Sequence, residues 1–479
     1  MIKKALILAA GQGTRLNHGR PKPAFPLLGI PLLVRTLFTL QEAGIEEVYI
    51  VIGYRADEVR RAVMPYQDRL LMRIHWIENP EWDRPNGVSV LKARPYLSEP
   101  FLMTMCDHIF DPSAVRALLR RGLNGASLVL AVDRNLQEVP DLEDATRVKL
   151  QGRKICRIAK LIDDFDAIDT GLFLAHPVLF EALSAAVEQG GETLSDGVQV
   201  LAEWGDAEVV DYEGSYWQDV DTPEDVRRAE QKLLKSLTKP TDGPISRRLN
   251  RPISRQISRW LVRTPVRPGM VTLFTFGVGL LSAWIAMHGG YFNFLVAAVL
   301  FQTASILDGV DGEIARLKFM TSRFGEWLDT ISDNLTYLIN LIALTIGAAR
   351  MGLNPVYVTA GLAGFAFGGL SFLSLYLYLI RTRRGGTILA VEYGYEKEND
   401  RFSRILQRLD YFGKRDVFSF ILLVMAIIGR LPDMLLVFCM ITMNLFLFSI
   451  LAHLRIAPPA IRTVFHGTPS KEEPRTALD

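Results

Sequence analysis

Long apolar runs fill the second half of the chain and constrain its fold more than any other feature. From about Val271 to Leu454 these runs recur with only short polar breaks. A run of about 20 apolar residues is long enough to cross a bilayer as a helix, in which every backbone polar group is satisfied internally. This half is therefore expected to be an all-α domain with six transmembrane helices, at the following positions: Val271–His288, Tyr291–Leu307, Gly325–Ala349, Pro355–Ile380, Asp416–Gly429 and Pro432–His453.

The first half, up to about Asp225, has the pattern of an ordinary soluble domain, so the overall hydrophobic content of 49% averages two unlike parts. Short apolar runs that suit buried strands alternate with helical patterns, and examples are KALILAAG, EVYIVIG and PFLMTMCDH. This alternation is typical of an α/β domain with a mostly parallel, Rossmann-like sheet. We expect this cytosolic domain to cover residues 1–230.

The first predicted strand ends in a glycine loop, LAAGQGTRL, in which Ala9, Ala10, Gly11 and Gly13 are candidate nucleotide-binding residues. Glycines let a backbone approach a ligand closely and point its N–H groups at phosphate. The loop is not a dinucleotide fingerprint, because Leu16 stands at the third glycine position, and no P-loop Gly-Lys-Ser/Thr follows. Taken alone, the loop is equally typical of a plain strand-to-helix turn.

Charged residues elsewhere in this half supply what a nucleoside triphosphate needs. Arg15 and Lys22 place two cations just after the loop, which suits a triphosphate and its departing pyrophosphate. Asp107 ends the strand MTMCDH, and Asp219 and Asp221 stand in WQDVDTPEDV near the end of the domain. Carboxylates from separate strand ends can hold Mg²⁺ or Mn²⁺, although a strand-end aspartate can also be a simple turn residue.

With these residues the first half resembles the sugar-phosphate nucleotidyltransferases, whose signature is Gly-x-Gly-x-Arg with a downstream Lys-Pro, matched here by Gly11, Gly13, Arg15, Lys22 and Pro23. The resemblance implies that a phosphomonoester attacks the α-phosphorus of a nucleoside triphosphate and that pyrophosphate leaves. It also implies residue roles, which are as follows: Arg15 and Lys22 as catalytic cations, Asp107 as the principal metal ligand, Asp219 or Asp221 as the second, Asn86 and Gly87 as nucleotide contacts, and Lys160 as an acceptor contact.

Residues 231–268 change composition sharply, with proline, glycine and many basic residues but few acids. The stretch ISRRLNRPISRQISRWLVR would suit an amphipathic helix on an anionic membrane surface, with Trp260 turned inward. A solvated basic linker would have a similar composition. We expect this segment to join the first domain to a membrane domain at 269–456, which a cytosolic tail at 457–479 follows.

Four aspartates stand where the second predicted membrane helix ends, in DGVDGEIARLKFMTSRFGEWLDTISDN. Asp308 and Asp311 are spaced i,i+3, and Asp329 and Asp333 are spaced i,i+4, so each pair occupies one face of its own helix. Carboxylates near membrane depth are tolerated when they face one another around a cation. The stretch therefore predicts a four-carboxylate metal site, in preference to aspartates that only solvate helix ends.

The full spacing, Asp-x2-Asp-Gly-x2-Ala-Arg-x8-Gly-x3-Asp-x3-Asp, resembles the signature of the CDP-alcohol phosphotransferases. The resemblance implies that the first three aspartates hold the metal ions that grip the CDP diphosphate and that Asp333 is the catalytic base. It also implies nucleotide contacts, namely at Gly312, Ala315, Arg316 and Gly325. Lys414 and Arg415 suit either an acceptor's phosphate or the membrane interface. Gly269 departs from the family, which has asparagine in the Pro-Asn-x-x-Thr entry to its first helix.

The two halves fit each other chemically, because the first would make the CDP-alcohol donor that the second consumes. A fusion in this order resembles the bifunctional inositol-1-phosphate cytidylyltransferase and di-inositol-phosphate phosphate synthase family. That resemblance implies that CTP and inositol 1-phosphate give CDP-inositol, which couples to a second inositol 1-phosphate and releases CMP, toward a compatible solute. The alternative is a lipid enzyme that activates another polyol or amino-alcohol phosphate and transfers it to a lipid hydroxyl. A transporter or sensor would leave the aspartate signature unexplained.

Basic residues are distributed unevenly around the predicted membrane helices. They crowd the segment before the first helix, the connections after the second and fourth, and the C-terminal tail. By the positive-inside rule we expect a multi-pass protein in the lipid bilayer of the cell inner (plasma) membrane, with both termini and both active sites cytoplasmic. Family resemblance implies a homodimer through the membrane domain. The net charge of +2 is too small to imply nucleic-acid binding.

Overall fold

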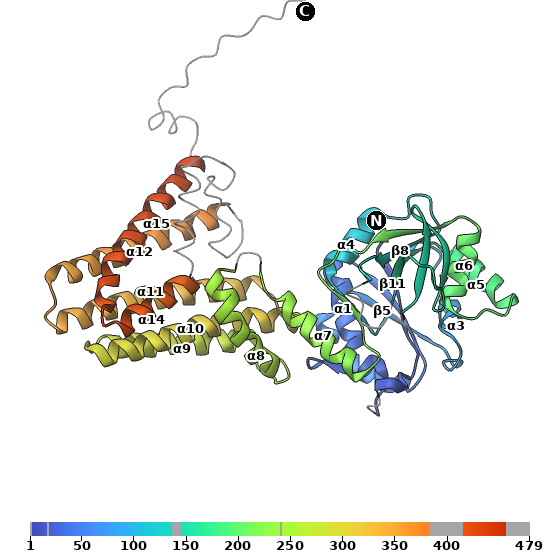
Figure 1. Ribbon diagram of the computed structural model, residues 1–479, viewed down its shortest axis with the longest axis horizontal. Coiled ribbons are helices and arrows are strands. Elements are labelled where there is room, and N and C mark those ends of the chain that lie inside the picture. The colour runs from blue at the N-terminus through green and yellow to red at the C-terminus, as the bar shows by residue number, and fades with distance from the viewer. Residues whose placement is uncertain (1, 17–18, 137–144, 240–241, 383–414, 457–479) are drawn as a thin grey trace, which may run out of the picture. The chain divides into compact units, whose positions relative to one another are not determined.

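The chain forms two compact units, Met1–Leu237 and Thr238–Asp479. The structure is a computed structural model that describes the following residues: 2–16, 19–136, 145–239, 242–382 and 415–456 (Figure 1). The first unit combines strands and helices, whereas the second is helical. The predicted order of an α/β domain followed by a helical domain is therefore confirmed.

A nine-stranded sheet forms the centre of the first unit. Its strands are β1 (Lys4–Ala9), β4 (Glu47–Ile52), β5 (Arg73–Glu78), β6 (Phe101–Met105), β8 (Leu128–Asp133), β9 (Arg147–Gln151), β10 (Lys154–Ala159), β11 (Ala167–Ala175) and β12 (Ala207–Asp211). Their order in the sheet is β5-β4-β1-β6-β11-β8-β12-β10-β9. Only β11 and β10 run against the other seven strands, which share one direction. The mostly parallel sheet of the prediction is confirmed.

Helices cover both faces of this sheet (Figure 1). They are α1 (Leu32–Ala43), α2 (Ala56–Val63), α3 (Asn86–Leu91), α4 (Pro112–Arg121), α5 (Val178–Glu188), α6 (Leu194–Glu203) and α7 (Pro223–Ser236). Helices α3, α5 and α6 share one hydrophobic core with Leu6 and Leu8 of β1. Helices α1 and α4 contribute no residue to that core and pack against each other. Since β1 is buried on both faces, its sequence is a continuous apolar run without alternation.

Two short antiparallel strand pairs complete the first unit. They are β2 (Pro26–Leu27) with β3 (Ile30–Pro31), and β7 (His108–Phe110) with β13 (Trp217–Asp219). The β7–β13 pair places Asp219 directly opposite His108. It therefore brings the end of the domain back to the residues that follow β6.

The second unit consists of helices, which span the following residues: η4 (Ser246–Asn250), α8 (Arg251–Leu261), α9 (Pro268–Ala286), α10 (Tyr291–Leu317), α11 (Arg323–Arg350), α12 (Pro355–Thr382), α14 (Arg415–Ile427) and α15 (Met434–Ile456). Among the described residues, 4 helices, α9 to α12, are long and apolar enough to cross a membrane. Helices α14 and α15 lie at the fifth and sixth predicted positions, where the apolar helices Asp416–Ile427 and Leu431–Leu447 are shorter. The predicted count of six spans is therefore not confirmed.

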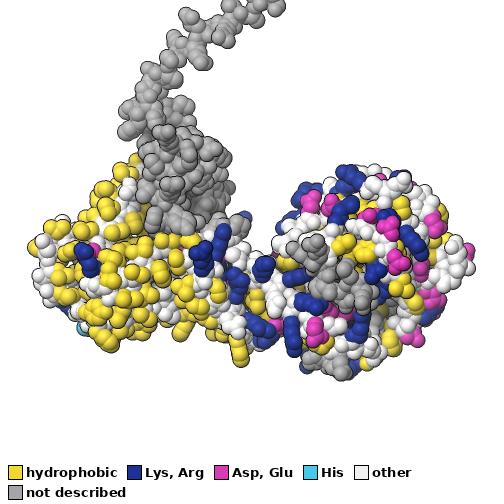
Figure 2. Space-filling model, viewed as in Figure 1, with side chains coloured by type: hydrophobic (Ala, Val, Ile, Leu, Met, Phe, Trp, Pro, Cys, Tyr) yellow, Lys and Arg dark blue, Asp and Glu magenta, His cyan; other side chains and the backbone are white. Residues whose placement is uncertain are grey.

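Helix α10 is longer than predicted, because it continues from Leu307 through the aspartate motif to Leu317. On the visible face of the helical unit, hydrophobic side chains dominate the surface, whereas charged side chains gather on the α/β unit (Figure 2). Large apolar side chains such as Phe274, Trp284 and Phe292 are exposed. Such a surface is typical of a protein that lies in lipid.

Candidate active sites

Lys22 is the centre of a charged cluster in the first unit. It begins the short 3₁₀ helix η2 (Lys22–Ala24), its side chain is buried, and its Nζ pairs with the carboxylates of both Asp107 and Asp221. Arg15, in the 3₁₀ helix η1 (Thr14–Leu16), donates from Nη2 to Asp221 Oδ2 at 2.7 Å. The structure thus brings together four residues that the sequence singled out, two cations and two carboxylates.

Gly13 makes the position of Lys22 possible. It has a φ of +67°, and a Cβ added to it would lie 2.5 Å from the Cβ of Lys22. A larger residue there would both strain the backbone and displace the lysine stem. In the same loop, Ala10 accepts a hydrogen bond from the Tyr54 backbone at 2.9 Å, and Gly11 is exposed with open space around it. Ala9 is the buried last residue of β1.

Two strand ends deliver the carboxylates. Asp107 follows β6, which is parallel to β1, so it lies at the same edge of the sheet as the glycine loop. Asp219 ends β13, opposite His108, and Asp221 follows two residues later. Asp225 fixes this last segment, because its Oδ2 accepts from the backbone N–H groups of Thr222 at 2.9 Å and of Asp221 at 3.3 Å.

The charges of this cluster stabilise one another. Burial alone would lower the pKa of Lys22, but Asp107 and Asp221 outweigh burial and raise that pKa well above its usual value. Burial alone would raise the pKa of Asp107, yet Lys22 and His108 hold it well below its usual range. For Asp219 burial prevails and raises the pKa. Lys22 and Asp107 are therefore ionised near neutral pH, whereas Asp219 would gain from a nearby cation.

The remaining predicted residues of this unit lie on other elements. Asn86 begins α3, and its Oδ1 accepts from the Leu194 backbone N–H at 2.8 Å. Gly87 donates to the Glu192 carbonyl at 3.1 Å, so closely that an added Cβ would lie 2.5 Å from that oxygen. Lys160 is exposed just after β10. Asn86 and Gly87 thus fix α3 against the start of α6. Their role as nucleotide contacts remains a prediction.

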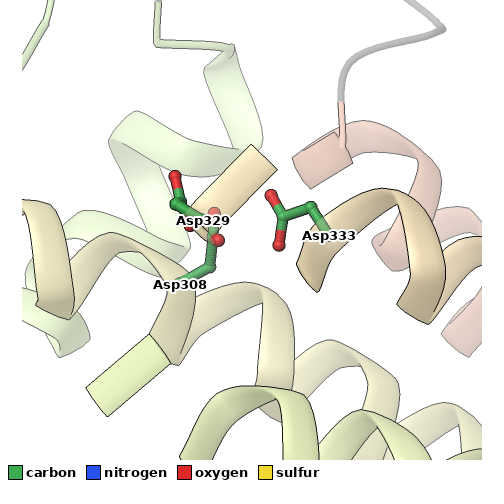
Figure 3. Close-up of side chains that lie close together, drawn as sticks. All are labelled: Asp308, Asp329 and Asp333. Atoms are coloured by element: carbon green, nitrogen blue, oxygen red, sulfur yellow. The ribbon is translucent and has the colours of Figure 1, made fainter. Parts of the chain in front are cut away.

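A second cluster lies between two helices of the membrane unit. Asp308 of α10 and Asp329 and Asp333 of α11 offer carboxylate oxygens that all lie within 4.8 Å of one another (Figure 3). All three residues are half-buried. Three carboxylates so close together repel one another unless a cation lies among them, and their oxygens are the ligands that Mg²⁺ and Mn²⁺ prefer.

Asp311 takes a different position from the other three. Its Oδ2 accepts a hydrogen bond from Thr272 Oγ1 of α9 at 2.6 Å, and it is buried. The cluster that could hold a metal ion therefore includes Asp333, which was predicted to be the base. It does not include Asp311, which was predicted to be a metal ligand. Both roles remain predictions.

The other motif positions lie around these aspartates. On α10, the Arg316 guanidinium covers Gly312, since an added Cβ there would lie 3.5 Å from Arg316 Nη1. Ala315 shares this stretch of α10. Gly325 donates its backbone N–H to Ser322 Oγ at 3.0 Å, which caps α11. Lys414 lies outside the described residues, and Arg415 is the first residue of α14.

Comparisons with known proteins match both units. The family model of the MobA-like NTP transferase domain matches residues 5–202. The family model of the CDP-alcohol phosphatidyltransferases matches residues 266–451. A bifunctional IPC transferase and DIPP synthase of Rubrobacter xylanophilus is 40% identical over 72% of this chain and 77% of its own length. The chain belongs to the family of bifunctional IPC transferases and DIPP synthases.

A second family member, from Aquifex aeolicus, is 31% identical over 92% of this chain and 96% of its own length. The match therefore runs through both units and the segment between them. A solved structure, the inositol-1-phosphate CTP transferase from T. maritima, has 25% identity and a TM-score of 0.41, and covers 47% of this chain and 91% of its own. Like other members of the IPC transferase and DIPP synthase family, the chain is an enzyme with a nucleotidyltransferase and a CDP-alcohol phosphotransferase domain.

Two residues that contact the predicted aspartates, His108 and Thr272, were not predicted from the sequence. His108 Nδ1 lies 2.8 Å from Asp107 Oδ1, and its ring fits only because Gly171 has no side chain. Thr272, the threonine of the motif from which Gly269 departs, contacts Asp311. His108 directly follows Asp107 in the sequence, which was an available signal. Nothing in the sequence pairs Thr272 with a residue 39 positions away.

Proposed function

We propose that this chain carries out two consecutive reactions on inositol phosphates. In the first, the phosphate of inositol 1-phosphate attacks the α-phosphorus of CTP, which gives CDP-inositol and pyrophosphate. In the second, a hydroxyl of another inositol 1-phosphate attacks the β-phosphorus of CDP-inositol, which gives di-inositol phosphate phosphate and CMP. The observation that carries this proposal is the match to a bifunctional IPC transferase and DIPP synthase over 92% of the chain.

For the first reaction, we assign the phosphates of CTP to Arg15, Lys22 and the glycine loop. Both cations now neutralise Asp107 and Asp221, so a triphosphate would compete with these carboxylates for Lys22. Asp107, with Asp219 or Asp221, would hold Mg²⁺ or Mn²⁺ in exchange, and a bound metal ion neutralises phosphate charge. Asn86 and Gly87 are assigned to the nucleotide and Lys160 to the acceptor, on family resemblance alone.

For the second reaction, we assign donor binding to Asp308, Asp311 and Asp329 and proton abstraction to Asp333. A base must lie within hydrogen-bond reach of the hydroxyl that it deprotonates. Asp333 comes from the same face of α11 as Asp329, within 4.8 Å of two donor-binding carboxylates, so an acceptor hydroxyl near the donor phosphate would also be near it. The nucleotide contacts Gly312, Ala315, Arg316 and Gly325, and the acceptor contacts Lys414 and Arg415, belong to the same proposal.

The cellular setting is proposed on the same basis. The membrane helices would place the chain in the cell inner (plasma) membrane, with both termini and both active sites cytoplasmic, and with a homodimer formed through the membrane domain. The uneven distribution of basic residues supports this orientation. The boundaries proposed for the parts are residues 1–230, 231–268, 269–456 and 457–479.

The substrate assignment can be tested with the purified full-length chain. With Mg²⁺, CTP and inositol 1-phosphate, the chain should release pyrophosphate and then CMP, and mass spectrometry should detect CDP-inositol and the coupled product. Other polyol phosphates and amino-alcohol phosphates serve as competing substrates. A chain that used neither inositol 1-phosphate nor CDP-inositol, but transferred another group to a lipid hydroxyl, would overturn the assignment.

A further inference from the structure

The segment between the two catalytic parts is docked on the helices of the membrane unit. Asn250 lies 3.0 Å from Gln302 and 3.4 Å from Ser305, both on α10. The Ser246 backbone N–H donates to Asp416 Oδ2 at 2.6 Å, at the start of α14. Although its composition is that of a basic linker, residues 242–258 therefore form part of the packed membrane unit.

Arg251 makes the strongest of these contacts. Its Nε and Nη2 donate to the two carboxylate oxygens of Asp242 at 2.9 and 2.7 Å, and its Nη1 donates to Glu313 Oε1 at 2.9 Å. The Glu313 carboxylate also accepts from Ser254 Oγ at 2.8 Å and from Ser258 Oγ at 2.7 Å. Glu313 has an exposed fraction of 0% and Arg251 of 8%, so Glu313 is fully buried and Arg251 almost fully buried, and both charges are hydrogen-bonded.

Glu313 lies within the aspartate motif of α10, on the side away from the carboxylate cluster. At 100° per residue, Gly309 and Glu313 are neighbours on one face of the helix, while Asp308 and Asp311 occupy another. Gly309 lets Arg251 cross α10 closely, because a Cβ added there would lie 2.9 Å from Arg251 Nη1. One stretch of helix thus presents Asp308 to the carboxylate cluster on one face and receives α8 on the other.

A buried ion-pair network of this kind is weak evidence for stability, because the cost of desolvation offsets most of the attraction between its charges. Its better supported effect is to fix register, since the charges can pair in only one arrangement. Arg251 can contact Asp242 and Glu313 together only when α8 lies at one height and one rotation on α10. That arrangement also sets how Asp308 and Asp311 face the site.

We propose that Arg251 is a positioning residue of the phosphotransferase site, which fixes helix α10 through Glu313 so that Asp308 and Asp311 meet the diphosphate of the CDP-alcohol donor. Asp242 orients the guanidinium, and Gly309 makes room for it. The segment that joins the two parts of the chain therefore helps to position residues of the second active site. The choice of CDP-inositol as donor rests on the proposed function, whereas the role of Arg251 holds for any CDP-alcohol that the chain uses.

The test compares Arg251→Lys and Arg251→Met with the wild-type full-length chain. A shift of α10 misplaces the donor-binding aspartates, and a misplacement of about 1 Å can cost up to about 100-fold. We expect the KM for CDP-inositol to rise at least about tenfold in both variants. Loss of folded enzyme would instead lower the apparent kcat and leave KM unchanged. Pyrophosphate release from CTP should stay normal, and Arg248→Met, which changes an exposed arginine of the same segment, should leave both reactions unchanged.

A neutral triple variant, Asp242→Asn with Arg251→Met and Glu313→Gln, separates position from stability. Arg251→Met alone leaves two carboxylates without their cation and should lower the thermal midpoint. The triple variant removes all three charges, so its midpoint should lie within a few degrees of the wild type, while its KM for the donor stays high. If this variant recovers both the midpoint and the KM, or if Arg251→Lys and Arg251→Met keep the wild-type KM, the proposal is wrong. If the wild type uses a CDP-alcohol other than CDP-inositol, the substrate assignment fails, and the same comparison with that donor decides the role of Arg251.

Discussion

Lys22 joins three parts of the chain that are far apart in sequence. Its two carboxylate partners are 85 and 199 positions away, and its stem packs on Gly13. The sequence could identify Lys22, Asp107 and Asp221 as candidate site residues, because each residue type suits phosphate or metal. It could not pair them, since their approach depends on the order of strands in the sheet.

Asp107 should be essential for the first reaction. Asp107→Asn removes the charge that pairs with Lys22 and would hold the metal, so pyrophosphate release from CTP should fall at least about 100-fold. Lys22 keeps Asp221 as a partner in this variant, so the fold should survive, as judged by the thermal midpoint. Asp57→Asn, at an aspartate whose side chain is 86% exposed, is the matched control. Near-normal release by Asp107→Asn would contradict the assignment.

Asp333 should differ in role from the other carboxylates of its cluster. If it is the base, Asp333→Asn should bind CDP-inositol nearly normally and lose transfer by at least about 100-fold. Asp308→Asn should lose both, because it removes a donor-binding ligand. Calorimetric titration with the donor and CMP release measure the two effects. Because Asp333 lies in the same carboxylate cluster as Asp308 and Asp329, equal loss of donor binding in both variants would instead make Asp333 a ligand.

At the scale of elements, local patterns predicted most of what the structure contains. The continuous apolar run of β1 and the long apolar stretches of α9 to α12 arise from burial and lipid contact, which act on every residue of the segment. The packing of helix α8 was harder to predict from the sequence. Its exposed Trp260 and Ile253 fit an amphipathic helix, but the burial of Arg251 depends on Glu313, 62 positions away, and no local pattern contains that pair.

The first turn of α7 holds the backbone of Asp221, a residue of the first site. Thr222 and Asp225 form a capping box, and Asp225 also accepts from the Asp221 backbone. Asp225→Ala should destabilise the unit by at least about 1 kcal/mol, because it removes half of the capping box and a buried, hydrogen-bonded carboxylate. It should also lower the rate of pyrophosphate release, because Asp221 would lose its support beside Lys22 and Arg15.

Helix α6 offers the control for this prediction, since Thr193 and Asp196 form a second capping box there. Asp196→Ala should cost about 1 kcal/mol of the free energy of unfolding, through loss of the capping box alone, while it leaves Asp221 in place. Thermal unfolding and pyrophosphate release are measured for both variants. A loss of activity that simply followed stability in both would show that α7 has no special role at the site.

At the scale of the whole molecule, the chain carries one carboxylate site in each of two compact units. The sequence predicted both sites through motifs, and it predicted the order of the two units. It could not predict that residues of the basic segment are docked on α10 and α14, because the composition of a docked segment and of a free linker is similar. The two sites share no described residue, so each should work when the other is lost.

Two variants of the full-length chain test this independence. An Asp107→Asn chain should fail with CTP and inositol 1-phosphate, because it cannot form the donor, yet it should give the coupled product from CDP-inositol. An Asp329→Asn chain should do the reverse and accumulate CDP-inositol. When the two variants are mixed with CTP and inositol 1-phosphate, a freely diffusing intermediate would restore coupled product at a rate that rises with the concentration of the Asp107→Asn chain. Loss of both reactions in either single variant would contradict the separation of the sites.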